Sequence, residues 1–266
     1  MKKSPNYPIK VLNKTFSILE ILLRHGSAMN MTEISKKLKL YPSTIHRILD
    51  TLKYWGYVEQ DPHTQEYQLG LKVLELGMAK LQQMDLVKEA TPYLKELVKL
   101  CNETIHLGVL EEGEVLYLAK EESSKTIRMI SYVGKRAPLH CTALGKVLLA
   151  HLSAEEREKI LGEKVLPRLT ENTITNKREL EKELDKIKEQ GFALDREENE
   201  KDVCCIAAPI RNYQGEVIAA LSISSPIFRI DKNVQNNLKG ALLETSEKIS
   251  KRLGYNAKSQ KEIIKR

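Results

Sequence analysis

The amino-acid sequence predicts an α+β protein with a helical N-terminal domain, a linker helix and a C-terminal antiparallel sheet flanked by helices. Three observations predict this class. Residues 31–56 read as two short helices joined by a tight turn. Two short strands and a narrowly apolar helix follow them. From residue 85 onward, alternating apolar strands arranged as hairpins are interspersed with amphipathic helices.

The helix pair over residues 31–56 has a defined polarity. Thr32 is suited to cap the first helix, and Pro42 fits the first turn of the second, where its missing N–H costs nothing. At 3.6 residues per turn, one arc of the second helix is apolar and should face a core. That arc consists of Ile45, Ile48, Leu49 and Leu52.

The remaining surface of the second helix is rich in small hydroxyls and carries one arginine. Hydroxyls and helix N-termini contact phosphates, and an arginine can reach O6 and N7 of guanine in the major groove. An ordinary amphipathic helix pair with a solvated outer face is the alternative. With Thr32 on the first helix, the candidate DNA contacts here are Ser43, Thr44, His46, Arg47 and Thr51.

The surrounding residues complete a winged helix-turn-helix plan. Residues 11–25 form the third helix of the bundle, and residues 57–60 and 65–69 read as strands on either side of a turn. Thr64 and Gln65 at the wing tip are further candidate DNA contacts, although a plain surface hairpin has the same pattern. In residues 71–83, apolar residues recur three or four positions apart and form a narrow apolar stripe on one side of a helix. It predicts a linker helix that pairs with a second copy of the chain, the alternative being packing onto its own domain.

The C-terminal part alternates strands and helices. The strand pattern predicts two hairpins and two further strands, at residues 127–133 and 192–195. The hairpins are expected at residues 104–119 and 204–224, and the helices at residues 86–101, 141–152, 179–190 and 233–253.

The charge of the chain is unevenly distributed. The net charge is +7, of which residues 1–83 contribute +5 and residues 254–266 contribute +3. Positive charge on the segment with the helix pair favours DNA, where it releases counterions, although it also improves solubility. No signal peptide or membrane-spanning stretch is recognisable, so we expect a cytoplasmic protein, without membrane contact, whose four cysteines are reduced.

Two long motifs carry a family resemblance. Residues 134–150 read GKRAPLHCTALGKVLLA, and residues 191–209 read GFALDREENEKDVCCIAAP, followed by SISSP at residues 222–226. Together they closely resemble the effector-binding domain of IclR-type bacterial transcription regulators. Residues 40–47, LYPSTIHR, stand where that family has its recognition helix.

The resemblance implies a transcriptional regulator with a GAF-like C-terminal domain that binds a small organic acid. It further implies a homodimer, often paired into a homotetramer, on a palindromic operator in double-stranded DNA, most often as the repressor of a catabolic operon. The backbone N–H groups of Ala143 and Leu144 are expected to bind the effector's carboxylate. The other expected effector contacts are Met129, Asp195, Cys205, Ser222 and Ser224.

The domain boundaries follow from these assignments. We expect a tail at residues 1–8, the DNA-binding domain at 9–70, the linker helix at 71–84, the effector-binding domain at 85–253 and a basic tail at 254–266.

Two other classes of function compete with this interpretation. A metal-responsive regulator could use cysteines and histidines of the C-terminal domain, but their spacing matches no compact zinc motif. A small-molecule enzyme could use His140, Cys141 or Ser222, but the chain has no nucleophile-elbow pattern. We therefore expect no catalytic residues, no resident metal and no cofactor.

Overall fold

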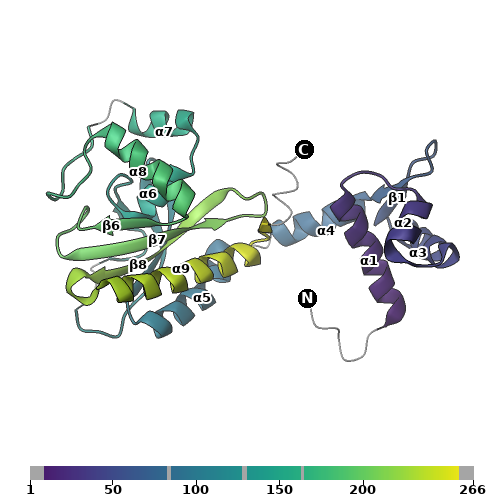
Figure 1. Ribbon diagram of the computed structural model, residues 1–266, viewed down its shortest axis with the longest axis horizontal. Coiled ribbons are helices and arrows are strands. Elements are labelled where there is room, and N and C mark those ends of the chain that lie inside the picture. The colour runs from purple at the N-terminus through teal and green to yellow at the C-terminus, as the bar shows by residue number, and fades with distance from the viewer. Residues whose placement is uncertain (1–8, 83–84, 128–130, 163–164, 258–266) are drawn as a thin grey trace. The chain divides into compact units, whose positions relative to one another are not determined.

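The computed structural model describes residues 9–82, 85–127, 131–162 and 165–257. The chain divides into two compact units, Met1–Met84 and Asp85–Arg266 (Figure 1). Among the described residues, no helix is both long enough and apolar enough to cross a membrane.

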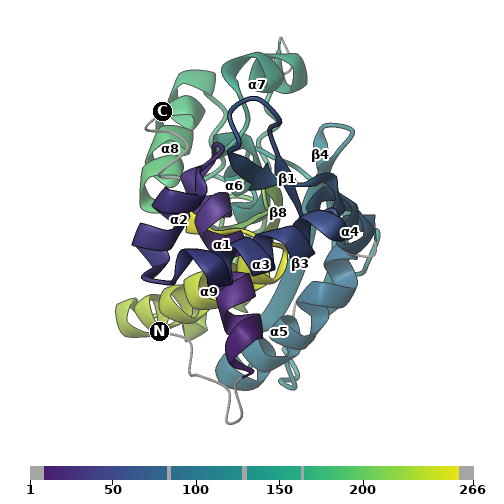
Figure 2. The ribbon, with the colours of Figure 1, turned by 90° about the vertical axis from the view of Figure 1, so that its right-hand side faces the viewer.

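The first unit is a three-helix bundle with a β-hairpin and a further helix (Figure 2). Its elements are α1 Lys10–His25, α2 Met31–Leu38, α3 Pro42–Tyr54, β1 Val58–Gln60, β2 Tyr67–Leu69 and α4 Leu71–Gln82. All four residues of the predicted apolar arc of α3 are buried, in a cluster with Ile18 and Ile34. This arc holds α3 on α1 and α2 and leaves its opposite face exposed.

The turns of the first unit follow local backbone chemistry. Gly26 ends α1 and Lys39 ends α2, both in the left-handed conformation with φ of 70° and 53°. Pro42 begins α3, as predicted. The cap of α2 was wrongly predicted: it is Asn30, whose Oδ1 accepts from the N–H of Glu33 at 2.9 Å, while Thr32 lies two residues further on, inside the helix.

The wing strands are shorter than predicted. Gln65 adopts a left-handed φ of 61°, which ends the regular strand geometry on that side of the turn. Asp61 Oδ1 accepts from the N–H groups of His63 at 2.7 Å and Thr64 at 2.9 Å, and these bonds tighten the turn. Only Val58–Gln60 and Tyr67–Leu69 pair as antiparallel strands.

The second unit is an antiparallel sheet covered by helices on both faces. Within the described residues the sheet has six strands, in the order β5-β4-β3-β8-β7-β6. Helices α6 and α8 cover one face, and α5 and α9 pack on the other (Figure 1). The strands are β3 Thr104–Glu111, β4 Glu114–Glu121, β5 Arg136–Ala137, β6 Ala193–Arg196, β7 Val203–Arg211 and β8 Val217–Pro226. The helices are α5 Leu86–Cys101, α6 Ala143–Ala150, α7 Ala154–Leu161, α8 Lys177–Gln190, the 3-10 turn η1 Ile227–Arg229 and α9 Lys232–Arg252.

The α+β class and both predicted hairpins are confirmed, but the strand predicted at residues 127–133 is not found where the segment is described, and residues 128–130 lie outside the described residues. The described residues of that segment, 127 and 131–133, contain no strand. The place beside β4 is taken instead by Arg136–Ala137, which pairs with Leu116 and Val115. Helix α7 was not predicted, because its apolar residues form no regular stripe, although Ser153 and Glu156 form a capping box at its start.

Candidate nucleic-acid interface and small-molecule site

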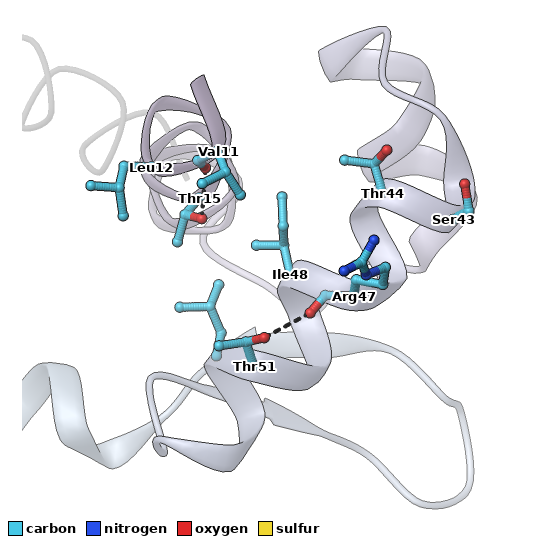
Figure 3. A pocket seen from close by; sticks show the side chains of 9 residues that line it. Val11, Leu12, Thr15, Ser43, Thr44, Arg47, Ile48 and Thr51 are labelled. Carbon is cyan, nitrogen blue, oxygen red and sulfur yellow. Dashed lines mark hydrogen bonds between the residues drawn. The ribbon is translucent and has the colours of Figure 1, made fainter. Parts of the chain in front are cut away.

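A groove of about 540 Å³ runs between α1 and α3 (Figure 3). One wall is formed by Val11, Leu12 and Thr15 of α1. The other wall contains four of the predicted DNA contacts, namely Ser43, Thr44, Arg47 and Thr51. The groove therefore brings most of the predicted contacts on α3 together on one side of the helix.

Arg47 is the exposed cation of this groove. The hydroxyl of Thr51 donates to the backbone carbonyl of Arg47 at 2.9 Å, drawn as the dashed line in Figure 3. The guanidinium itself has no hydrogen-bond or ion-pair partner within the described part of the chain. Its five N–H donors are thus available to an external acceptor.

A second groove, of about 390 Å³, separates α3 from the wing. His46, Thr64 and Gln65 line it, so the remaining predicted contacts on α3 and the wing meet here. His46 Nδ1 lies 3.0 Å from Asp50 Oδ2, and Gln65 Oε1 accepts from Gln60 Nε2 at 2.9 Å. These side chains are oriented by neighbours rather than held by a core. Thr32 is exposed on α2 and lines neither groove.

The strand register of the second unit brings most of the predicted effector contacts onto one face of the sheet. Asp195 on β6 lies opposite Cys205 on β7, which in turn lies opposite Ser224 on β8. Ser222, two residues before Ser224, shares its face because side chains alternate along a strand.

Helix α6 packs on this face of the sheet, against β6, β7 and β8. Ala143 and Leu144 are its first two residues, and both are buried. Gly108 on β3 allows the approach: a Cβ there would lie 3.2 Å from Cδ1 of Leu144 and 2.8 Å from Cγ1 of Val115. The predicted residues therefore converge from one helix and three strands. Met129 lies outside the described residues.

Hydrogen bonds link the polar side chains of this face. The thiol of Cys205 donates to the Oγ of Ser224 at 3.2 Å. The same Oγ lies 3.3 Å from Nδ1 of His106, and Nε2 of His106 lies 2.7 Å from the Oγ of Ser131. Burial raises the pKa of the Cys205 thiol well above its usual value, so the sulfur keeps its proton and acts as a donor.

Asp195 is buried at the edge of the site. Its Oδ1 accepts from the N–H of Glu198 at 2.8 Å and, less closely, from that of Asn199 at 3.4 Å. Burial raises the pKa of the carboxyl to about 7, because desolvation outweighs these bonds. One oxygen that was predicted to face the effector is therefore already engaged by the backbone.

A buried ion pair lies next to Asp195. Lys146 of α6 is fully buried, and its Nζ donates to both carboxylate oxygens of Glu198, at 2.5 and 2.7 Å. The pair ties α6 to the segment that follows β6. It thereby fixes the position of the α6 N-terminus relative to Asp195.

His140 and Cys141 do not form a nucleophile and base. Nε2 of His140 lies 3.0 Å from the carbonyl of Pro167, whereas the thiol of Cys141 donates to Asn199 Oδ1 at 3.7 Å. Burial raises the pKa of Cys141 to about 12, so the thiol is not ionised at neutral pH. Within the described residues, no three His, Cys, Asp or Glu side chains are grouped to hold a metal ion.

Two family models cover most of the chain. The IclR helix-turn-helix domain matches residues 11–62, and the model for the C-terminal domain of the bacterial transcriptional regulator IclR matches residues 78–251. The chain belongs to the IclR family. Its members are DNA-binding transcriptional regulators rather than enzymes, which agrees with the class predicted from the sequence.

Individual relatives span nearly the whole chain. The HTH-type transcriptional regulator KdgR of Escherichia coli K12 is 40% identical over 255 residues, covering 96% of each chain. The crystal structure of the Agobacterium tumefaciens repressor BlcR is 25% identical with a TM-score of 0.81, covering 94% of this chain and 99% of that one. The crystal structure of the E. coli KdgR C-terminal domain is 40% identical with a TM-score of 0.60, covering 65% of this chain and all of that domain.

Within this IclR-family fold, the site also contains a buried polar residue that the sequence did not predict. His106 contacts Ser224 and Ser131, and its ring centroid lies 4.9 Å from that of Tyr117. Strand alternation could have placed His106 on the polar face, since it lies two residues before Gly108. No sequence signal connects it to Ser131, because that contact depends on the path of a loop.

Proposed function

We propose that the chain is a repressor of a catabolic operon whose affinity for a palindromic operator is controlled by a small organic acid. The observation that carries the proposal is the polar face formed by Ser222, Ser224, Cys205 and Asp195 on the side of the sheet that α6 covers. The name of the BlcR relative, a repressor, supports the direction of control.

The start of α6 supports the binding of a carboxylate. Thr142 caps the helix, and its Oγ1 accepts from the N–H of Gly145 at 3.1 Å. The N–H groups of Ala143 and Leu144 precede that bond and point along the helix dipole toward its positive end. A carboxylate accepts from such groups favourably, and the hydroxyls of Ser222 and Ser224 can donate to the same ligand.

Asp195 supports a ligand that carries a hydroxyl group as well as the carboxylate. Its Oδ1 accepts hydrogen bonds from backbone N–H groups. A ligand hydroxyl could bond to the hydrogen-bonding positions of the carboxyl that the backbone does not occupy. With a pKa of about 7, the carboxyl can either accept from a ligand hydroxyl or donate to a ligand oxygen near neutral pH. Met129 remains part of the proposed contact set.

The first unit supports specific binding to DNA. Ser43, Thr44, Arg47 and Thr51 on the α1 side of α3 are proposed to contact bases and phosphates, with His46, Thr64 and Gln65 on the wing side. Thr32, at the start of α2, is proposed to contact a phosphate.

A second copy of the chain is part of the proposal. Leu71 and Leu74 on α4 are 73% and 59% exposed, as expected for the seam of a helix that pairs with its equivalent. A homodimer presents two recognition helices to two half-sites, and this is why a palindromic operator is proposed. Two dimers can then pair into a tetramer.

Footprinting on the promoter region of the protein's own gene tests the proposal. We expect a protected palindrome whose protection changes when glyoxylate, pyruvate or gluconate is added. Ser222→Ala combined with Ser224→Ala should keep the footprint but blunt its response to the acid. Absence of any protected palindrome, with or without the acids, would show that the proposal is wrong, and identical titration curves would place the effector elsewhere.

A further inference from the structure

A chain of four side chains runs through the second unit and ends in a loop. It begins at Cys205 on β7, continues through Ser224 on β8 and His106 on β3, and ends at Ser131, in the segment between β4 and β5. The imidazole of His106 therefore joins a residue of the proposed effector site to a loop residue outside it. The Cα atom of His106 also lies directly opposite Ser222 in the sheet.

The imidazole of His106 is neutral. It is 3% exposed, and burial, with the charges of Lys120 and Lys135, lowers its pKa to about 3. A neutral imidazole has one N–H donor and one acceptor nitrogen. One of the two serine hydroxyls must therefore donate to the ring, and the other must accept from it.

The thiol at the start of the chain favours one direction of these hydrogen bonds. Because Cys205 donates to Ser224, the hydroxyl hydrogen of Ser224 is available to Nδ1 of His106. Nε2 then carries the ring hydrogen and donates to Ser131.

An anion at Ser224 reverses this direction. An anion only accepts, so it takes the hydroxyl hydrogen of Ser224. Nδ1 of His106 must then carry the ring hydrogen, and Nε2 becomes an acceptor. Ser131 has to turn its hydroxyl to donate, while Lys120 Nζ continues to hold its carbonyl at 2.7 Å.

We propose that His106 is a positioning residue that transmits occupancy of the Ser224 site to Ser131 by changing its tautomer. The proposal rests on the proposed function, because it requires an anionic ligand at Ser224. One hydrogen leaves Nε2 and one joins Nδ1, by exchange with water. Both serines keep their own hydrogens, so the total number of bound protons is unchanged.

Two other histidines supply internal references for each tautomer. Nε2 of His140 faces the carbonyl of Pro167 at 3.0 Å, and Nδ1 of His151 faces the carbonyl of Val147 at 2.9 Å. A carbonyl only accepts, so His140 is the Nε2–H tautomer and His151 is the Nδ1–H tautomer.

Nitrogen-15 NMR of the full chain, labelled on its histidine rings, tests the proposal. Each ring is assigned by the signals lost on a single substitution to asparagine. In the free chain, His106 is expected to match His140. With pyruvate or gluconate at a concentration that raises the melting temperature, His106 is expected to shift to match His151, while His140 and His151 do not shift.

The outcomes separate this proposal from the proposed function. A free chain in which His106 already matches His151 overturns the tautomer change without any ligand. A probe that raises the melting temperature but leaves His106 unshifted also overturns it, and leaves the proposed function standing. If no acid raises the melting temperature or alters the footprint, the proposed function fails, and the ligand-driven change fails with it.

Two substitutions distinguish transmission from simple support of Ser224. His106→Asn keeps an amide near the position of Nδ1, toward Ser224, and His106→Gln keeps one near Nε2, toward Ser131. Neither amide can contact both Ser224 and Ser131. If His106 transmits occupancy, both variants should lose the probe-induced change in hydrogen exchange at residues 131–135. If that change persists in His106→Asn, the ring only supports Ser224 and the proposal is wrong.

Discussion

The polar surface of the first unit and the polar face of the second are built in opposite ways. The surface around α3 comes from a continuous stretch, residues 43–65, and its side chains are mostly exposed. The face beneath α6 joins residues as far apart in sequence as His106 and Ser224, and nearly all of its side chains are buried and already hydrogen-bonded.

The two surfaces must therefore bind their partners in different ways. A partner of the first unit finds donors such as the guanidinium of Arg47 ready for use, so contacts are simply added. A ligand of the second unit must replace existing hydrogen bonds, and breaking one without replacement leaves a buried polar group unsatisfied. The second unit is therefore the part in which binding must rearrange side chains.

The largest effect is expected from the buried ion pair of the second unit. Lys146→Met leaves the carboxylate of Glu198 buried without its cation, which should lower the free energy of unfolding by about 3–5 kcal/mol. Urea denaturation at neutral pH measures this change. The loss should shrink as the pH falls, because protonated Glu198 no longer needs a counter-charge.

Two variants check that the charge is responsible. Glu198→Leu added to Lys146→Met should recover most of the lost stability, since no unpaired charge then remains. Lys248→Met removes the exposed partner of Glu244 and should cost far less, because water screens that pair. If Lys146→Met costs no more than Lys248→Met, the buried pair does not hold α6 in place.

The second prediction concerns the exposed surface. Arg47→Ala should weaken specific operator binding by about 1–3 kcal/mol, the range for an arginine that contacts a guanine with two hydrogen bonds. The melting temperature should not change, because Arg47 is exposed. Fluorescence anisotropy with the footprinted operator measures the affinity. Arg24→Ala removes an exposed arginine paired with Glu20 on α1 and is the control; equal affinities for both variants would remove Arg47 from base readout.

The third prediction uses the raised pKa of Asp195. Between about pH 4 and pH 7 the unfolded chain has an ionised Asp195 while the folded chain keeps the proton. The folded state therefore binds more protons, and the contribution of Asp195 to stability falls as the pH rises through this window.

Asp195→Asn isolates that contribution. The amide oxygen can still accept from the N–H groups of Glu198 and Asn199, but the side chain cannot ionise. The variant should gain stability over the wild type, by an amount near zero at pH 4 that rises to roughly 2–4 kcal/mol at pH 8. Urea denaturation at both values measures it. A variant that is less stable at pH 8 would show that the buried carboxylate stabilises the fold.

The two units also differ in how much the sequence predicts. In the first unit, Gly26, Pro42 and the apolar arc of α3 are local signals, and each corresponds to an observed helix end or buried face. In the second unit, local alternation predicted both hairpins but also a strand at residues 127–133, of which the described residues 127 and 131–133 show none. It did not predict Arg136–Ala137, which pairs with Leu116 and Val115 of β4.

The polar face of the second unit shows the same limit. Its members at 195, 205, 222 and 224 came from the family resemblance, and the strand register brings them together. The bonds from His106 to Ser131 and from Lys146 to Glu198 could not be predicted, because each joins segments whose separation in sequence carries no periodic signal.

The smallest effect is expected at the start of α2, where the sequence pattern indicated the wrong capping residue. Asn30, not Thr32, caps α2 through the N–H of Glu33. Asn30→Ala should therefore lower the free energy of unfolding by about 1 kcal/mol. Thr32→Ala should change it by less than about 0.5 kcal/mol, because the Thr32 side chain is exposed and does not cap the helix. Thermal unfolding of the two variants side by side measures the difference. An equal loss in both would mean that the start of α2 does not depend on a single capping residue. Local sequence signals would then determine the structure of the first unit less fully than its other helix ends indicate.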